Sequence, residues 1–217
     1  MADIFHEVDE EVRRERLHKF WERYSILIIG LAVLIVGGIG AWRGYEWYIS
    51  KQAAAAGAKF EVAVTLAEQG KHAEAQAAFA KLGTEAPAGY KVLSRLRAAA
   101  ELVESKPEEA AKAYDTLAAD ASLGRTVQDL AAIHGGMLRV DSAPFAEMQQ
   151  KLSALTEPGR PFRHSARELL ALSAWRSHDV ANARKYIEMI TQDAESPPNM
   201  RTRAEILSAL IVAAGKS

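Results

Sequence analysis

The stretch "GKHAEAQAAFAKLGTEAP", residues 70–87, decides the fold of this chain because its pattern returns three times. The later segments share its length, its alanines and its charged residues: "SKPEEAAKAYDTLAADAS" from Ser105, "DSAPFAEMQQKLSALTEP" from Asp141 and "HDVANARKYIEMITQDAE" from His178. The alanines that we take as equivalent, with spacings of 35, 36 and 37 residues, are Ala75, Ala110, Ala146 and Ala183. A period of this size built from two helices is typical of a helical solenoid.

A further helix is predicted before each of these segments. The four ranges are roughly 51–68, 88–104, 123–139 and 162–176. Alternation of β-branched and polar residues is almost absent, and glycine and proline lie mainly between the segments. We therefore predict an all-α fold. A last amphipathic helix, "NMRTRAEILSALIVAAG" (199–215), is expected to cover the apolar end of the array.

The first two segments resemble the tetratricopeptide repeat family. The second helix of that repeat carries a small residue, an aromatic residue four positions later and a proline about twelve positions later. The first segment matches this pattern with Ala75, Phe79 and Pro87. The second segment matches it with Ala110 and Tyr114 but lacks the proline.

The last two segments follow the same pattern with substitutions. The third keeps Ala146 and Pro158 without the aromatic residue, and the fourth keeps Ala183 with Ile187 in the aromatic place. A small side chain lets two paired helices approach, and the larger one fills the space between repeats.

A second informative stretch is "SILIIGLAVLIVGGIGAW", residues 25–42, which contains no charged residue. A helix of this length reaches about 27 Å, close to the ~30 Å hydrocarbon thickness of a bilayer. Aromatic residues, which prefer the membrane interface, flank the run on both sides. These predicted interface anchors are Trp21, Tyr24, Trp42, Tyr45, Trp47 and Tyr48. We predict a retained single-pass anchor, with a buried helix of a globular protein as the alternative.

The flanks of this run predict its orientation. Lys and Arg resist translocation, and the leader carries five of them against three over a comparable distance after the run. We therefore predict a cytoplasmic leader at 1–24, a transmembrane anchor with interfacial aromatics at 25–48, and a repeat domain at 51–217 beyond the membrane. The leader is too long and too acidic for a cleaved secretory signal. Its apolar spacing fits either an amphipathic segment at the inner surface or a solvated extension of the anchor helix.

The composition argues against several classes of function. The formal net charge is −1 and no basic tract is interleaved with aromatic residues, so we expect no nucleic-acid partner. The six histidines lack the spacing of a zinc hydrolase, cysteine is absent, and no glycine-rich phosphate loop occurs. We therefore expect no enzyme activity, no cofactor and no metal site. The stretch "HGG" at 134–136 is interpreted as a helix irregularity.

A binding surface is the better candidate, because solenoids expose a long concave face formed largely by the first helix of each pair. The predicted partner contacts are polar and aromatic residues of those helices: Tyr90, Arg97, Arg125, Gln128, Arg163 and Arg167. Arg163 and Arg167 share one helix face in the first turns, where the helix dipole disfavours cations, which hints at a use. The alternatives are solvated surface for the charged residues and core packing for Tyr90.

The whole chain has a second resemblance. The charged leader "DIFHEVDEEVRRERLHKFWERY" (3–24), one anchor and divergent tetratricopeptide repeats resemble the bacterial family that includes the YfgM-type ancillary subunit of the SecYEG translocon. The resemblance implies a bacterial inner-membrane protein with a periplasmic C-terminal domain. It also implies protein partners, namely the translocon, secreted chains or periplasmic chaperones. The alternative is a self-assembling structural module that dimerises through "EILSALIVAAG" (205–215), for which Gly40 and Gly44 offer a second close approach between anchors.

Overall fold

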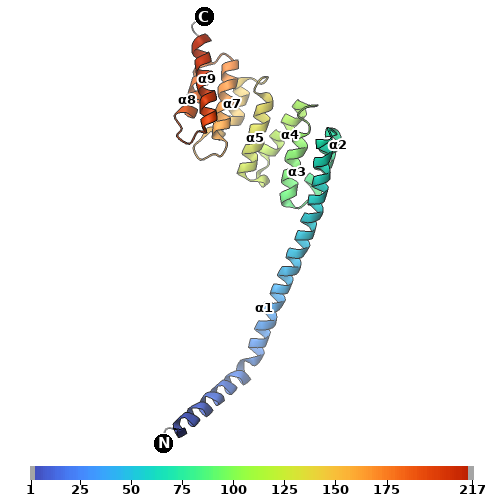
Figure 1. The fold of residues 1–217 in the computed structure, drawn as a ribbon, viewed down its shortest axis with the longest axis vertical. Helices are drawn as coiled ribbons and strands as arrows, with labels where there is room; N and C mark the ends of the chain where they lie inside the picture. Colours follow the sequence, from blue (N-terminus) through green and yellow to red (C-terminus); the bar gives the residue numbers. More distant parts are fainter. Residues whose placement is uncertain (1–2, 215–217) are drawn as a thin grey trace. The chain divides into compact units, whose positions relative to one another are not determined.

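The computed structural model describes residues 3–214, with the side chains of His18 and of residues 21–214. Over this range the chain is all-α, as predicted, and contains no strand (Figure 1). The α-helices are α1 (Asp3–Glu68), α2 (His72–Glu85), α3 (Ala88–Ala100), α4 (Pro107–Ala119), α5 (Arg125–Arg139), α6 (Phe145–Leu152), α7 (Arg163–Arg176), α8 (Val180–Thr191) and α9 (Pro198–Ala214). Two 3₁₀ turns are η1 (Ala121–Leu123) and η2 (Ser153–Thr156). Most of the leader side chains that carry its predicted amphipathic pattern lie outside the described residues.

The chain divides into two compact units, Met1–Ala54 and Ala55–Ser217. In the first unit, the uncharged run of α1 leaves its apolar side chains exposed, with Ile26 at 83% and Leu34 at 71%. Soluble monomers rarely expose apolar patches larger than a few hundred Å². Among the described residues, α1 is the one helix that is long and apolar enough to cross a membrane, and its apolar window is unburied. The run is therefore compatible with a single-pass membrane protein, whereas a buried globular helix would have been covered.

The six predicted interface aromatics are all exposed on α1. Lys51 Nζ lies 4.6 Å from the centroid of the Trp47 ring. Gln52 Nε2 donates a hydrogen bond of 2.7 Å to Tyr48 Oη. These contacts hold polar groups beside aromatic rings at the end of the run, an arrangement suited to a membrane interface. The anchoring role of the aromatics stays a prediction.

Local sequence explains where the helices of the second unit begin. α4 starts at Pro107, whose missing N–H costs nothing in the first turn of a helix. α5 starts at Arg125, two residues later than predicted. The reason is that the Asp120 side chain accepts the backbone N–H of Ser122 at 3.1 Å and stabilises the short turn η1 before the helix.

In the second unit, successive helices lie side by side as in a helical solenoid (Figure 1). The most extensively packed pairs are α2 with α3, α4 with α5 and α7 with α8. α9 packs on α8 and α7. The predicted first helices correspond to the end of α1, α3, α5 and α7, and the repeated segments form α2, α4, α6–η2 and α8. Of the predicted pairs, α7 with α8 is among the most extensively packed, whereas α2 and α4 pack more extensively on α3 and α5, the first helices of the following repeats.

The second helices confirm most of the predicted repeat frame. Ala75, Ala110 and Ala183 are fully buried, and each is the fourth residue of its helix. The assignment of Ala146 is wrong, because Ala146 is exposed and the fully buried Met148 is the fourth residue of α6. With Met148 in place, the spacings along the chain become 35, 38 and 35 residues. The third repeat thus has a large side chain where the others have alanine.

The interpretation of "HGG" as a helix irregularity is also wrong. α5 runs unbroken from Arg125 to Arg139. A Cβ atom on Gly136 would lie 3.0 Å from Leu152 Cδ1, and one on Gly135 would lie 3.4 Å from an Asp115 carboxylate oxygen. The two glycines therefore let α5 approach α6 on one side and α4 on the other.

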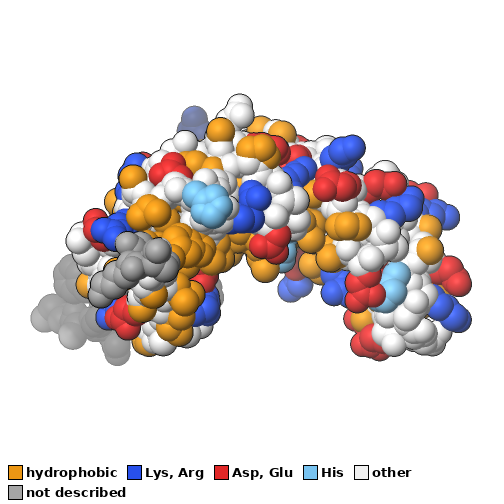
Figure 2. Space-filling view, turned by 90° about the horizontal axis from the view of Figure 1, so that it is seen from above, with side chains coloured by type: hydrophobic (Ala, Val, Ile, Leu, Met, Phe, Trp, Pro, Cys, Tyr) orange, Lys and Arg blue, Asp and Glu red, His pale blue; other side chains and the backbone are white. Residues whose placement is uncertain are grey.

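The end of the array is only partly covered. α9 buries Ala204, Leu207 and Ile211, as expected of a capping helix. Its other side is apolar as well, with Ile206 57% and Leu210 54% exposed. The space-filling view shows hydrophobic side chains gathered over the C-terminal helices (Figure 2). This apolar face lacks the polar outer surface that capping helices of solenoids usually present to water.

Candidate functional site

A groove of about 650 Å³ lies between α4 and the α6–η2 segment, over the N-terminal half of α5. We call it the α5 groove. Its lining contains small apolar side chains, one amide and five charged residues. The charged residues are Arg125, Asp129, Lys151, Glu157 and Arg160. A groove with this lining can hold a polypeptide segment through both apolar contact and ionic pairing.

Two glycines with positive φ shape the ends of this groove. Gly124, with φ of 75°, precedes α5 and provides no side-chain cap, so the helix N-terminus is open. Gly159, with φ of 83°, turns the chain after η2. This turn brings Arg160 to Asp129, and the guanidinium donates a hydrogen bond of 2.7 Å to Asp129 Oδ1.

The cations of the α5 groove differ in how far they are neutralised. Lys151 Nζ donates to Asp115 Oδ2 at 3.0 Å, and Arg139 donates two further hydrogen bonds to the same carboxylate. Burial alone would raise the pKa of Asp115, but the hydrogen bonds from Arg139 and Lys151 outweigh it and hold this pKa below its ordinary value. The Arg125 side chain, by contrast, is exposed and has no hydrogen bond or ion pair within the described part of the chain.

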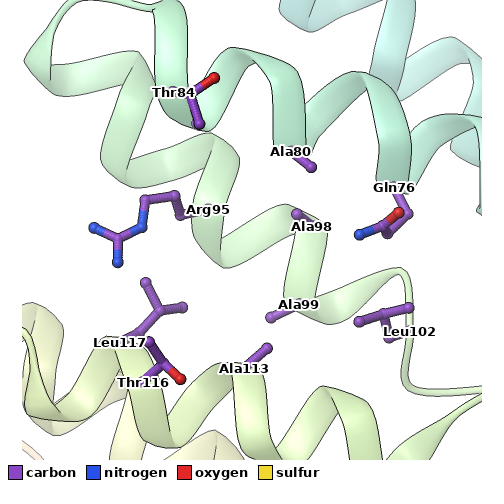
Figure 3. Close-up of a pocket in the computed structure, with 11 residues that line it drawn as sticks. Gln76, Ala80, Thr84, Arg95, Ala98, Ala99, Leu102, Ala113, Thr116 and Leu117 are labelled. Atoms are coloured by element: carbon purple, nitrogen blue, oxygen red, sulfur yellow. The ribbon is translucent and has the colours of Figure 1, made fainter.

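A second groove lies in the corresponding place one repeat earlier, between α2 and α4 over α3 (Figure 3). This α3 groove has a volume of about 350 Å³, and its walls are mostly apolar. Its cation, Arg95, donates a hydrogen bond of 2.7 Å to Asp120. Hydrogen bonds from Ser122 and Arg95 lower the pKa of Asp120 to about 2. The α3 groove therefore offers an apolar surface with a neutralised cation, whereas the α5 groove offers an unpaired one.

Two of the six predicted partner contacts lie in the α5 groove. Arg125 and Gln128 both line the α5 groove. Gln128 also braces the groove, because its Nε2 donates a hydrogen bond of 3.1 Å to the carbonyl oxygen of Ala118 on α4. Their role in partner binding stays a prediction.

Tyr90 and Arg97 lie in packing positions away from this groove. The Tyr90 ring centroid is 5.8 Å from that of Phe60 on α1, in agreement with the alternative of core packing. The Arg97 guanidinium lies 5.5 Å from the centroid of the Phe79 ring and forms an ion pair of 3.4 Å with Glu101. Their role in partner binding, like that of Arg125 and Gln128, stays a prediction.

Arg163 and Arg167 belong to an internal polar network. Arg167 is 4% exposed and donates to the carbonyl oxygens of Thr156 and Met189 and to Asp193 Oδ2. Arg163 also donates to Asp193 Oδ2, at 3.0 Å. Hydrogen bonds from Arg163 and then Arg167 hold the pKa of Asp193 well below its usual range.

This network gives the two arginines a different explanation from the predicted one. Their position near the N-terminus of α7, where the helix dipole disfavours cations, suggested that a partner binds them. Within the fold, however, the Asp193 carboxylate neutralises their positive charge. Because Arg167 is buried and its guanidinium N–H groups are already hydrogen-bonded, the proposed contact surface does not include it. Arg163, whose side chain is mostly buried, is left out for the same reason.

Sequence reasoning missed four charged residues of the groove, namely Asp129, Lys151, Glu157 and Arg160. The Pro-Gly pair at 158–159 signals a turn, but nothing local indicates that Arg160 returns to an aspartate 31 residues earlier. Among the described residues, no group of acidic residues and histidines has the arrangement of a metal site.

Comparison with known proteins gives one match. The family described as tetratricopeptide repeat-like domain matches residues 18–169, which is more than half of the chain and includes the uncharged run 25–42. No significant match is found among curated proteins or among solved structures. Such repeats typically form protein-interaction scaffolds. The all-α fold agrees with this match, and the chain belongs to the tetratricopeptide repeat-like domain family.

Proposed function

We propose that this protein is a non-catalytic, membrane-tethered interaction scaffold. The observation that carries the proposal is one chain with an unburied apolar helix and a separate repeat unit that has open grooves. A tether keeps the grooves at high local concentration near membrane partners, so a weak contact gains occupancy without any new interaction. The general role as a repeat scaffold for protein partners follows from the family.

The finer proposal is an ancillary role at the bacterial protein-translocation channel. Its support is the resemblance of leader, anchor and divergent repeats to the YfgM-type family, together with the excess of cations before the apolar run. In this arrangement the leader is cytoplasmic, and the repeat domain lies in the periplasm. The repeats would then meet secreted chains or periplasmic chaperones.

Protease accessibility tests the topology. Protease added to intact spheroplasts is expected to digest the region after Lys51 and to spare the leader, because only the periplasmic side is reachable. The products are identified with antibodies against each end, and detergent-permeabilised cells serve as the control in which both ends are cut. Digestion of the leader with survival of the repeats would reverse the orientation.

Exchange of the anchor tests the division of labour between the two units. Replacing residues 25–42 by an unrelated apolar span should weaken copurification with the channel while capture of a soluble partner continues. The matched control is Ile26→Val, which keeps the same span and should change neither. If the exchanged chain retains the channel as well as the original does, the anchor contributes no recognition beyond membrane attachment.

Self-assembly is a second candidate, favoured by the exposed Ile206 and Leu210 on α9. If this face is a dimer contact, Leu210→Lys should convert the full chain in detergent from a dimer to a monomer in light scattering. The control is Val62→Lys, a substitution of an equally exposed apolar residue on α1. A concentration-independent monomer for the unsubstituted chain would remove this candidate.

A further inference from the structure

We propose that the apolar surface between α7 and α9 is the contact between two copies of this chain, in which the two α9 helices pack antiparallel about a twofold axis near Ser208. We call this surface the α7–α9 face. The inference rests on the second candidate function, self-assembly, and deepens it. It assigns the side of α9 that makes the contact, the orientation of the two helices and their register.

The first observation is that the second half of α9 is apolar around nearly its whole circumference. Of residues 206–214, only Ser208 is polar. One side buries Leu207 and Ile211 in the fold. On the neighbouring side, Ile206 and Leu210 stay more than half exposed. A helix that is apolar all round is typically a buried helix, so the exposed side is expected to be covered by another surface.

The second observation is the shape of the surface beside α9. An apolar pocket of about 260 Å³ lies between α7 and α9. Its walls include Leu172 from α7 and Ile206 and Leu210 from α9. The exposed side chains of α9 thus form a ridge at the edge of a pocket. Such a face can be self-complementary, because a twofold axis places the ridge of each copy against the pocket of the other.

The third observation is the charge, which differs between the two sides of α9. Among the described residues, the charged ones that line the α7 side are Glu168 and Arg203. Arg203 donates hydrogen bonds through Nε and Nη2 to the two carboxylate oxygens of Glu168, so their charges cancel. The groove on the α8 side is lined by Glu188 and Glu205, and its described lining includes no cation.

This difference in charge selects the side that a second copy can cover. Two α8 sides would bring four carboxylates together, and like charges across an interface are costly. Two α7–α9 faces bring no net charge together. A neutral face also gives little attraction to a strongly charged partner. A second copy, which carries the same neutral face, therefore fits best.

The register follows from the two exposed large side chains of α9. In an antiparallel pair about residue 208, Ile206 faces Leu210 of the partner subunit, and the twofold axis repeats this contact. Thr202 precedes Ile206 by about one turn, and Ala213 follows Leu210 by about one turn, so both lie on the exposed side. Thr202 then lies beside Ala213 of the partner subunit. The ion pair of the face stays at the rim, and a polar rim around an apolar centre is usual for protein interfaces.

The contact is small, so the membrane tether contributes to it. Its apolar centre consists of three large side chains from each copy, whereas a standard interface contains roughly 20–30 residues on each side. Two copies anchored in one membrane have a high effective concentration for each other, which raises the occupancy of a weak contact. In detergent we therefore expect a dimer that depends on concentration.

Two matched substitutions test which side of α9 makes the contact. Leu172→Lys places a charge on the α7–α9 face, and Val212→Lys places the same charge in the α8–α9 groove. The two side chains are similarly exposed, at 38% and 44%. In light scattering of the full chain in detergent, Leu172→Lys should raise the dimer dissociation constant about tenfold or more, because it buries an unpaired charge. Val212→Lys should change it by less than about twofold.

Cysteine crosslinking tests the orientation, and the chain contains no cysteine of its own. Full chains with Thr202→Cys or Ala213→Cys and different tags are produced in the same cells, and the isolated membranes are oxidised with copper phenanthroline. In the antiparallel pair, the two copies of residue 213 lie about 15 Å apart along the helix axis, too far for a disulfide. The 202–213 product should therefore exceed the 213–213 product by about fivefold or more.

Circular dichroism reports whether each variant retains its helices, and the cysteine variants change exposed residues, so they test the contact even if Leu172→Lys unfolds. A monomer at every concentration, without a 202–213 product, would overturn the inference together with the self-assembly candidate. Equal losses for the two lysine variants would mean that the side is wrong. An excess of the 213–213 product would mean that the helices are parallel.

The same variants separate this inference from the scaffold function. If the chain is a monomer and Leu172→Lys lowers copurification of the channel or of a soluble partner, the α7–α9 face binds another protein and the inference falls while the scaffold function stands. If the dimer forms as described but no partner copurifies in any condition, the scaffold function falls and the inference stands.

Discussion

The first two repeats and the C-terminal repeats are held together in different ways. From the end of α1 to α5 there are two buried apolar clusters of four residues each, and each contains one aromatic ring and at least two alanines. From α5 to α9 a single cluster joins 17 buried residues, many of them large. The early repeats therefore depend on close backbone approach, and the later ones on filled volume.

The polar contacts follow the same division. Between the early helices the ties are partly exposed, such as Arg95 with Asp120 and His72 with Glu101. Around α7 the guanidinium of Arg167 is enclosed and bonded on several sides. Exposed ion pairs contribute little to stability, whereas removing one member of an enclosed pair leaves a buried group without compensation. The two halves should therefore respond differently to substitution.

The largest effect is expected from Arg167→Met. It leaves the carbonyl oxygens of Thr156 and Met189 without their donors and weakens the neutralisation of Asp193. We expect a loss of about 3 kcal/mol in the free energy of unfolding. Urea unfolding of the full chain in detergent measures this loss, and hydrogen exchange should place it in α7–α9.

The control for that substitution is Arg184→Met on α8, where the arginine is exposed. It should change the unfolding free energy by less than about 0.5 kcal/mol. Equal losses for the two variants would mean that the enclosed network adds nothing to the C-terminal repeats.

A smaller effect is expected from overpacking the early repeats. Ala75→Leu or Ala110→Leu places a large side chain at a fully buried position and should cost about 1–3 kcal/mol. Ala146 belongs to the same predicted alanine series, but it is exposed. Ala146→Leu should therefore lower the free energy of unfolding by less than about 0.5 kcal/mol. Thermal unfolding of the three variants ranks them. A large loss for Ala146→Leu would restore the original alignment of the third repeat.

The smallest effect is expected in the pH dependence. Burial and then the Arg163 charge lower the pKa of His164, whereas the hydrogen bond to Glu101 raises that of His72. The unfolded chain therefore binds more protons than the folded one at His164, and fewer at His72. The His164 contribution is complete above the unfolded pKa of about 6.5 and declines as the pH falls towards the lowered folded value. The His72 contribution is complete below about pH 6.5 and declines as the pH rises through the raised folded value.

Hydrogen exchange between about pH 7 and pH 5 separates these two contributions. Protection in α7 should decrease on acidification, and His164→Leu should flatten that decrease. Protection at the start of α2 should increase, and His72→Gln should remove the increase. Parallel behaviour of α2 and α7 in the unsubstituted chain would show that other carboxylates dominate the pH response.

The sequence predicted the early half better than the later half for a physical reason. A buried alanine with an aromatic residue four positions later lies on one helix face, so Ala75 with Phe79 and Ala110 with Tyr114 are visible as local patterns. In α6 the same two places hold Met148 and Leu152, and the nearby Ala146 drew the alignment away from them. Of the residues that line the groove, the sequence singled out Arg125 and Gln128, because Lys151, Glu157 and Arg160 come from separate parts of the chain.

What the sequence alone determined is what depends on neighbouring residues. The helical class, the approximate helix ranges, the repeat period and the uncharged run all follow from composition and spacing along a few turns. The tertiary structure decided which polar side chains are enclosed. Arg167 resembles a surface cation in the sequence, but its partners lie 11, 22 and 26 residues away, and only helix packing brings them together. Arg125 looks the same in the sequence and lies free at the rim of a groove, because burial is a property of the surrounding helices and not of the residue.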